Sequence, residues 1–495
     1  TALVAPASHL VLPSGTVRYN SDLLTEEPEL VDTDPQTVVY KIRPTAQWAD
    51  GTPISAKDYE YSWRVRTLRP AVPAAVPAEG DEPGAGYWLI DSVTAADNGR
   101  TVRVRFTSPM PDWRSLFNVL LPAHLGAATG DITTADGLLA SRDAFTSWPE
   151  WTGGPYTVSA SAPGRQVELV PNTAWYGAAS PTLEKLVFRF YDDRDSAVAA
   201  LERGELDALD LVPDRAAVTR VRALTRVGVG LHISASHDWT HLDLNSAGGY
   251  LSDRALRVAV LTAVGTTEIV EKAIRDFAPS ATPRMARHLF PGQPGYRDVL
   301  SEVAPEQGSG RADSALDGLA DAGYLVDGGR LHAASGEIVP PLRLRLAEGD
   351  PITGDAAELI RDQLDRIGLA VVIEPTPDLA ATRASGDFDL ILRDERDGPF
   401  LAPTVARWRG AVADDSAAWH NADSAALLER AAIELDEGKR RAILNRQDEL
   451  MTAAAVVLPL YQRPRLLAVA GGCVNIRANP SGGVLTYNAQ QWGLP

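Results

Sequence analysis

Residues 37–58 read TVVYKIRPTAQWADGTPISAKD, and this stretch decides the fold because it combines three local signals. Residues 37–43 are rich in β-branched and aromatic side chains and stop at a proline, a pattern that predicts a strand. Asp50-Gly51 indicates a tight turn. Ser55 followed by Asp58 predicts a capping box that starts a helix. This part of the chain is therefore expected to fold as strand, turn and helix.

Antiparallel hairpins are expected on the C-terminal side of this stretch. Within residues 92–106, Asn98-Gly99 is a strong hairpin turn, and the residues after it alternate as a half-solvated strand should. A second hairpin is predicted over residues 155–170. The proline- and alanine-rich residues 70–83 are expected to form a surface loop.

Later segments favour crossover units, in which a helix connects two parallel strands. Residues 186–190, 197–203 and 206–209 predict strand, helix and strand, which we interpret as a βαβ unit. A further unit of the same kind is predicted from the segments 342–346, 354–367 and 369–373.

Two long helices, over about residues 424–435 and 439–454, precede a strand at 456–461. A chain of 495 residues is too long for one hydrophobic core. The sequence therefore predicts an α/β protein built as two lobes.

The composition limits the classes of partner. The net charge of −18 argues against nucleic acid or an anionic membrane as the main partner. The single cysteine, Cys473, excludes an internal disulfide and a thiolate metal cluster. No stretch approaches the roughly 20 apolar residues of a membrane-spanning helix. Abundant alanine, proline and glycine, with arginine favoured over lysine, indicate a high-GC genome.

Several motifs then follow one another in a recognisable order. The stretch at 39–58 closely resembles a signature of the extracytoplasmic solute-binding proteins of family 5, the peptide-, dipeptide- and nickel-binding subunits of ATP-driven importers. The composition typical of a high-GC genome fits the actinobacterial members of this family. The resemblance continues through Gly154-Pro155-Tyr156, Trp175-Tyr176-Gly177, Arg203-Gly204-Glu205-Leu206-Asp207, Leu242-Asp243-Leu244-Asn245, Ala322-Gly323-Tyr324 and Pro459-Leu460-Tyr461.

The resemblance covers nearly the whole chain and implies a two-lobed binding-protein fold of cluster C, with an extra α+β subdomain in lobe one and a two-strand hinge. Carried onto this sequence, the hinge strands fall near Thr240–Asn245 and Leu460–Leu467. The extra subdomain spans residues 21–150 and lobe two spans 241–465. The core of lobe one comprises residues 1–20, 151–240 and 466–495.

The sequence departs from the family pattern in two places. The opening strand of the family is not recognisable in residues 1–20. A glycine-tryptophan pair of lobe two is replaced by the charged segment Arg393-Asp394-Glu395-Arg396-Asp397. In peptide-binding members, an aspartate of this segment pairs with the amino terminus of the ligand, and Asp397 is the positional candidate. A buried ammonium needs a carboxylate, whereas a ligand carboxylate suits an arginine.

Arg393, Glu395, Arg396 and Asp397 are therefore predicted to line the ligand site. The alternative is that this charged segment is a salt-bridged, solvated loop. Aromatic residues predicted to contact the ligand are Trp239, Trp419 and Tyr461, with Tyr87 and Trp88 from the extra subdomain. The alternative for each of them is a place in the core.

Enzyme chemistry finds little support in the sequence. His237 and His241 have the spacing of a helical zinc site, but their neighbours alternate as in a strand. Residues four apart on a strand lie roughly 13 Å from each other, too far to share one ion. Nucleophile elbows and phosphate-binding loops are absent. We expect no enzyme, no metal and no cofactor.

Two functions remain open. The first is the ligand-binding subunit of an ABC importer, a monomer that captures an oligopeptide or a peptide-like or amino-acid-like molecule by hinge closure and delivers it to a membrane permease. The second is a lipoprotein that resembles this family but regulates the synthesis of cell-envelope glycolipids through partner binding. Both place the protein outside the cytoplasmic membrane, on a lipid anchor.

Overall fold

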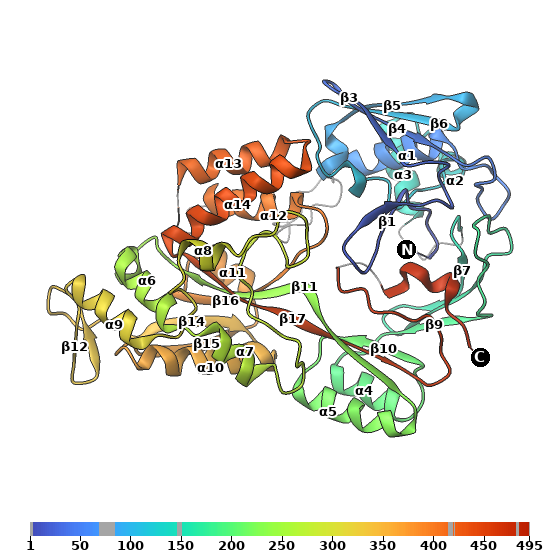
Figure 1. Cartoon of the computed structure of the whole chain (residues 1–495). Helices are drawn as coiled ribbons and strands as arrows, with labels where there is room; N and C mark the ends of the chain where they lie inside the picture. Colours follow the sequence, from blue (N-terminus) through green and yellow to red (C-terminus); the bar gives the residue numbers. More distant parts are fainter. Residues whose placement is uncertain are drawn as a thin grey trace. The chain divides into compact units, whose positions relative to one another are not determined.

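The structure is a computed structural model that describes residues 3–68, 85–145, 151–413, 419, 421–481 and 485–494 (Figure 1). The predicted loop at 70–83 lies outside these residues. Contacts divide the chain into two compact units. Unit 1 comprises Thr1–Leu211, Arg220–His232 and Leu467–Pro495, and unit 2 comprises Val212–Thr219 and Ile233–Leu466.

Unit 1 contains a four-stranded antiparallel sheet in the order β3-β4-β6-β5. Its strands are β3 (Glu29–Thr33), β4 (Gln36–Lys41), β5 (Ile90–Ala96) and β6 (Thr101–Phe106). The predicted hairpin turn is confirmed, since Asn98 and Gly99 both have positive φ angles. Helix α1 (Ala56–Thr67) starts at the predicted capping box, in which the Ser55 backbone N–H donates to Asp58 at 2.7 Å.

A second sheet of unit 1 is three-stranded. It consists of β7 (Tyr156–Ala162), β8 (Gln166–Pro171) and β9 (Leu186–Arg189), and the predicted hairpin at 155–170 is confirmed. Its core includes residues from both ends of the chain, such as Leu3, Val4 and Trp492. Further elements of unit 1 include β1 (His9–Val11), β2 (Val17–Tyr19), α2 (Ala123–Thr129), α3 (Ala135–Ala144) and the 3₁₀ segments η1 (Ala85–Leu89) and η7 (Leu485–Gln491).

The βαβ interpretation of residues 186–209 is wrong. The helix and the second strand exist as α4 (Arg194–Glu202) and β10 (Ala208–Leu211), but β10 pairs with β17 (Val457–Val469) and not with β9. Sequence periodicity identifies a strand without identifying its partner, and here the partner lies more than 240 residues further along the chain. Helix α5 (Arg215–Leu224) follows β10.

The largest sheet has six strands in the order β10-β17-β11-β16-β14-β15. Strand β14 (Leu342–Ala347) pairs in parallel with β15 (Val371–Thr376) and with β16 (Leu390–Arg396). Helix α10 (Pro351–Asp365) connects β14 to β15, so this predicted crossover is confirmed. It starts earlier than predicted because Asp350 caps it and Pro351 occupies its first turn.

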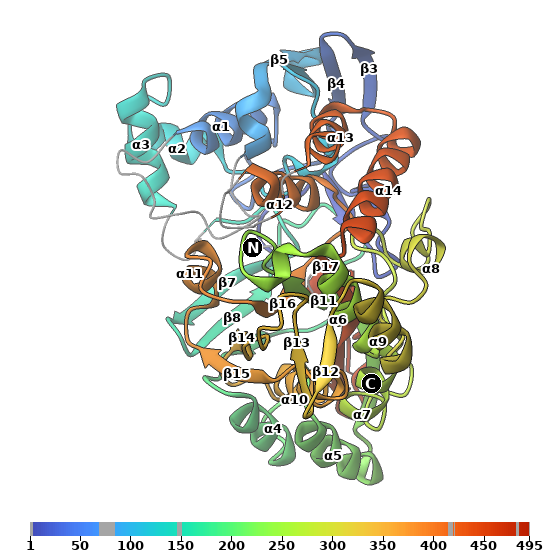
Figure 2. The same ribbon diagram turned by 90° about the vertical axis from the view of Figure 1, so that its left-hand side faces the viewer.

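Strands β11 (Gly230–Leu244) and β17 carry the chain from one unit to the other. In unit 2, α12 (Ala402–Ala413), α13 (Ala422–Ile433) and α14 (Glu437–Ala454) lie on one side of the sheet, and α7 (Thr266–Ala273) and α10 lie on the other (Figures 1 and 2). The two long helices predicted before the last strand are thus confirmed.

Unit 2 also contains α6 (Arg254–Ala263), α8 (Val299–Val303), α9 (Ala312–Asp321), α11 (Leu379–Ala384), β12 (Leu325–Asp327) and β13 (Arg330–His332). In the part of the chain that the structure describes, no helix combines the length and the apolar character needed to cross a membrane.

Candidate functional site

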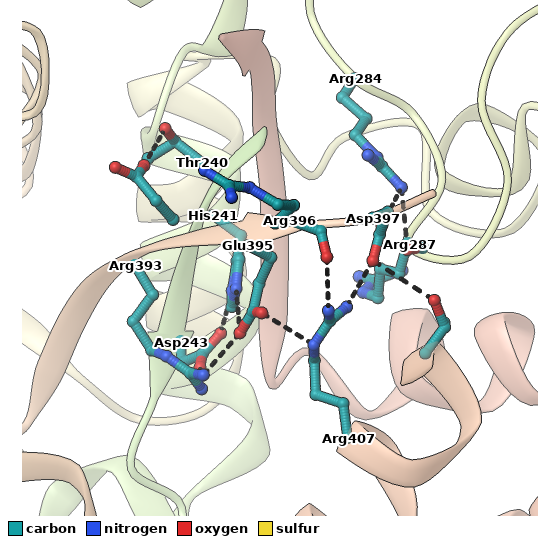
Figure 3. A network of polar contacts seen from close by, with 12 residues as sticks. Thr240, His241, Asp243, Arg284, Arg287, Arg393, Glu395, Arg396, Asp397 and Arg407 are labelled. Atoms are coloured by element: carbon teal, nitrogen blue, oxygen red, sulfur yellow. Dashed lines mark hydrogen bonds and ion pairs between the residues drawn. The ribbon is translucent and has the colours of Figure 1, made fainter. Parts of the chain in front are cut away.

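A buried polar cluster lies in unit 2, where β16 runs antiparallel to β11 (Figure 3). Arg393, Glu395 and Asp397 alternate along the chain, so their side chains share one face of the sheet. Their exposed fractions are 7%, 8% and 4%. The alternative of a salt-bridged, solvated loop is therefore wrong in its loop part: residues 393–396 belong to strand β16, and three of the five charged side chains are buried. The pairing by salt bridges that this alternative expected is present.

Glu395 is held by two guanidinium groups and a histidine. Arg393 Nη2 lies 2.5 Å and Arg407 Nε 2.8 Å from its carboxylate, and His241 Nε2 lies 3.7 Å away. Burial raises the pKa of Glu395, but the contact with His241 and the positive charges of Arg393 and Arg407 outweigh it and lower the pKa to about 2. Glu395 is therefore charged at neutral pH.

His241 connects this carboxylate to a second one. Its Nδ1 lies 2.5 Å from Asp243, which also receives a hydrogen bond of 3.3 Å from Arg393. Burial lowers the pKa of His241, but the neighbouring carboxylates outweigh burial and raise it above its usual value.

Asp397 is also paired within the protein. Arg407 Nη1 donates to it at 2.8 Å, Thr404 at 3.3 Å and Arg284 Nη2 at 3.4 Å. The guanidinium carbon of Arg284 lies 3.9 Å from the ring centre of Trp239 and 4.1 Å from that of Phe290. The ammonium group of a ligand would therefore compete with two arginines for Asp397.

Arg396 differs from its neighbours on β16. Its side chain is 77% exposed, and its Nε lies 3.3 Å from Asp238. Asp394, on the same side of the strand, accepts a hydrogen bond of 2.6 Å from Thr240 and pairs with Arg463. The predicted segment thus points charged groups to both faces of the sheet.

The predicted aromatic residues are scattered. Trp239 and Tyr461 are fully buried in unit 2, and Trp239 contacts the cluster through Arg284. Trp419 is partly buried and lines a separate pocket of unit 2. In unit 1, Tyr87 packs in the core and its hydroxyl accepts a hydrogen bond from the Phe117 N–H at 2.6 Å, whereas Trp88 is 38% exposed.

A pocket in unit 1 was not predicted from the sequence. It measures about 940 Å³, including the part that opens to solvent. Its walls come from residues 3–11, Gly153-Gly154-Pro155, Trp175-Tyr176 and the η7 segment, with polar residues from other loops. The polar residues are His9, Asn20, Asp22, Asn118, Thr486 and Gln490, and the Tyr487 ring lies beside them.

Two glycines allow the first wall to form. The Gly153 N–H donates to Val4 O at 3.0 Å, and the Tyr156 N–H donates to Leu3 O at 3.1 Å. A Cβ atom on Gly154 would lie 2.3 Å from Leu3 O, and one on Gly153 would lie 2.6 Å from Pro6. Residues 3–6 can therefore lie against this segment only because it carries no side chains.

The pocket offers polar groups that the fold leaves unused. The side chains of Asn20 and Asn118 are not among these unused groups, because Asn20 donates a hydrogen bond to Ala7 O and Asn118 accepts one from the His9 N–H. Among the described residues, no hydrogen-bond partner meets the side chains of Thr486, Tyr487 or Gln490. Aromatic walls with a few such groups are typical of small-molecule sites.

His9 adds a neutral imidazole at this pocket. Burial and the nearby charge of Arg114 lower the pKa of His9 to about 3, and neither ring nitrogen has a hydrogen-bond partner. The signal available in the sequence for this pocket was the pair Gly153-Gly154 before a strand, together with Trp175-Tyr176.

Metal ligands do not gather at either place. His237 and His241 both lie on β11, so the predicted strand geometry is confirmed. The His237 ring stacks on Phe290 at 4.2 Å instead. Within the described ranges, no group of three or more histidine, cysteine or acidic side chains is arranged to hold an ion.

Comparisons with known proteins agree with this architecture. Residues 20–410 match the family model described as bacterial extracellular solute-binding proteins, family 5. The solved structure of the periplasmic EDTA-binding protein EppA is 33% identical and superimposes with a TM-score of 0.87, covering 100% of this chain and 91% of EppA. The predicted α/β binding-protein fold is thereby confirmed.

Two similar proteins from Mycobacterium tuberculosis have names that give different ligands. The chain is 28% identical to the oligopeptide-binding protein OppA, over 96% of this chain and 77% of OppA. It is 26% identical to the probable monoacyl phosphatidylinositol tetramannoside-binding protein LpqW, over 75% of this chain and 59% of LpqW. The chain therefore belongs to the bacterial extracellular solute-binding proteins of family 5.

Proposed function

We propose that the protein is the ligand-binding subunit of an ABC importer and captures an oligopeptide or a peptide-like or amino-acid-like small molecule. The observation that carries this proposal is the pocket of unit 1. Its aromatic rings suit apolar side chains, and Thr486, Tyr487 and Gln490 offer groups that can bond to amides or carboxylates. The likeness to OppA supports the ligand class.

We further propose that the ligand stabilises a closed form by bending within β11 and β17, with 240–245 and 460–467 as the predicted hinge segments. Strand β11 passes from unit 1 to unit 2 between His232 and Ile233, ahead of its predicted segment, and β17 passes back between Leu466 and Leu467. Long strands shared by two compact units are suited to such a movement, because a few residues can absorb the change in backbone angles. The predicted lobes, with residues 241–465 as lobe two, form part of this proposal.

The charged segment of β16 is proposed to border the ligand. In this proposal Asp397 exchanges one arginine partner for the ammonium group of a peptide. Arg393, Glu395 and Arg396 provide the charged groups around that contact. Arg396, Trp88 and Trp419 have accessible side-chain surface that supports direct contact. Trp239, Tyr461 and Tyr87 would act from the core, by fixing the residues around the site.

The protein is proposed to be a monomer without catalytic activity, held outside the cytoplasmic membrane by a lipid anchor and docking on a separate permease. Membrane fractionation of the native strain, with and without a lipase, tests the anchor. Sedimentation of the purified chain tests the monomer.

A thermal-shift screen against mixed di- to decapeptides, amino acids, sugars and nickel tests the function. A ligand at about 100 times its dissociation constant adds about 2.7 kcal/mol to the free energy of unfolding. Peptides or amino-acid-like compounds should raise the melting temperature, and Tyr487→Phe combined with Thr486→Ala should reduce this rise. Val227→Ala, at a side chain that is 78% exposed, serves as the control.

One alternative is a regulator of cell-envelope glycolipid synthesis that acts by binding a partner protein. The likeness to LpqW, a probable monoacyl phosphatidylinositol tetramannoside-binding protein, is consistent with this alternative. This alternative predicts no thermal shift with any member of the panel. It also predicts that an envelope protein is recovered with the chain from crosslinked cells. A shift with peptides, lost in the pocket variant, would rule it out.

A further inference from the structure

A second pocket lies within unit 2, at the end of β16 opposite to Arg396, and Asp243 of the buried polar cluster is one of its lining residues. Leu244 at the end of β11 pairs with Leu390 at the start of β16, whereas Asp238 pairs with Arg396 at the other end. The pocket lies at the Leu244 end. The space between its walls measures about 500 Å³, including the part that opens to solvent.

The walls of this pocket are mainly apolar and aromatic. Trp408 of α12 and Trp419 contribute indole rings. The other lining residues come from β11, the turn before β16, α14 and the start of β17, and they are Asp243, Leu244, Arg383, Phe388, Gln447, Met451, Val456 and Val457. Apolar walls of this kind favour a ligand with an apolar body.

Most polar groups of the pocket already have protein partners. Asp243 is bonded to His241 and Arg393. The Gln447 side chain pairs with His288 at 2.5 Å and donates to Ser424 at 2.9 Å. Arg383 also has a partner. Because these side chains are already paired, they offer a ligand few free hydrogen-bonding groups. The pocket therefore does not require a charged ligand.

Trp408 is the exception. It is 4% exposed, yet its Nε1 has no acceptor among the described residues. A buried indole N–H usually finds an acceptor, because leaving it unpaired costs free energy. A buried water needs two to four polar partners, and a single donor in an apolar pocket offers only one.

We propose that this pocket is a binding site for a compact, uncharged molecule that has an apolar body and one hydrogen-bond acceptor. The apolar body packs between the indole rings of Trp408 and Trp419, and the acceptor, a carbonyl or ether oxygen, receives the Trp408 Nε1–H. All the lining residues belong to unit 2, so the site is separate from the unit 1 pocket. It shares Trp419 with the residues proposed to contact the imported ligand, but it does not rest on the function proposed for the unit 1 pocket.

Indole N–H resonances of the ¹⁵N-labelled full chain test this site directly. The chain has 11 tryptophans, and Trp408→Phe identifies the Trp408 signal by its loss. The probes are acetophenone, which carries one carbonyl acceptor, and ethylbenzene, which has the same carbon skeleton without an acceptor. Trp419→Ala removes one wall, and Trp151→Ala, at a partly buried indole of unit 1, is the matched control.

Acetophenone should shift the Trp408 signal in a saturable way and should bind about tenfold more tightly than ethylbenzene, the factor that one hydrogen bond provides. Trp419→Ala should weaken this binding, and Trp151→Ala should not. The proposal is overturned if the Trp408 signal shows no saturable shift, or if the shift persists unchanged in Trp419→Ala.

A crystal soak covers the case in which Trp408→Phe does not fold. Bromine density from 4′-bromoacetophenone between Trp408 and Trp419 supports the site. Soaked crystals that show bromine elsewhere or not at all contradict it.

Discussion

Arg407 donates a hydrogen bond of 2.8 Å to Asp397, and both side chains are almost fully buried. An aspartate expected to receive a ligand thus already has a charged partner ten residues along the chain. Breaking a buried ion pair by removing one partner leaves an uncompensated charge, which typically costs about 3–5 kcal/mol. Asp397 therefore has two testable roles, one in stability and one in ligand recognition.

The first prediction concerns Asp397→Ala. The variant should lose about 3 kcal/mol of unfolding free energy, because Arg284 and Arg407 lose their shared carboxylate. Binding of peptides with a free amino terminus should weaken by about 2–5 kcal/mol. Urea unfolding measures the first effect, and calorimetry with trialanine and N-acetyl-trialanine measures the second.

The acetylated peptide separates the two roles of Asp397. If the carboxylate receives the ligand ammonium, the wild-type protein prefers trialanine and the variant does not. A variant that is destabilised but keeps the same preference would show that Asp397 serves the fold alone.

The second prediction concerns the buried carboxylate of the cluster. Glu395→Gln should destabilise the protein by about 3 kcal/mol, because Arg393 and Arg407 lose a charged acceptor in a buried place. The matched control is Glu205→Gln, which breaks an exposed pair with Arg203 and should change stability by less than about 1 kcal/mol. An equal loss of unfolding free energy in the two variants would contradict the view that burial determines how much an ion pair contributes to stability.

Local signals in the sequence predicted much of the fold. The capping box at Ser55, the Asn98-Gly99 turn and the crossover through α10 depend on residues close together in the chain, and all three are confirmed. The pairing of β10 with β17 depends on residues far apart, and no periodicity encodes it. Prediction failed where the partner of a strand lay far along the chain, as for β10 and β17.

The candidate sites follow the same division. The sequence identified the charged segment around Asp397 but not the arginines that neutralise it, since Arg284 lies 113 residues away and comes from an irregular loop. The unit 1 pocket combines residues from both ends of the chain. Its formation depends on tertiary contacts between segments such as Leu3 and Gly154, which short motifs do not specify.

The third prediction tests that contact. Gly154→Ala would place a Cβ atom 2.3 Å from Leu3 O, so the segment at 3–6 must shift and the wall of the unit 1 pocket moves with it. The variant should lose about 1–3 kcal/mol of unfolding free energy, and it should no longer bind any ligand found for this pocket.

Gly248→Ala, where no heavy atom lies within 4 Å of the new Cβ, is the control. Chemical denaturation and ligand-induced thermal shift measure the two effects. A Gly154→Ala protein with wild-type stability and binding would contradict the role given to this glycine.

The last prediction concerns pH and His237, whose ring stacks on Phe290 at 4.2 Å. Burial and the nearby charge of Arg284 lower its pKa to about 4, although Asp397 acts in the opposite direction. The unfolded chain, with an ordinary histidine pKa of about 6.5, therefore binds more protons than the folded protein between pH 6.5 and 4. Stability linked to His237 is fully present above pH 6.5 and is lost as the pH falls towards 4, by at most about 3 kcal/mol.

His237→Phe removes the titrating group and keeps an aromatic ring on Phe290. The wild-type protein should lose more stability than this variant when urea unfolding is compared at pH 7 and pH 4.5. His232→Phe, at an exposed histidine of the same strand, should behave like the wild-type protein. Parallel pH profiles for the wild-type protein and His237→Phe would mean that His237 titrates alike in the folded and unfolded states, and that burial and the charge of Arg284 do not hold the imidazole neutral.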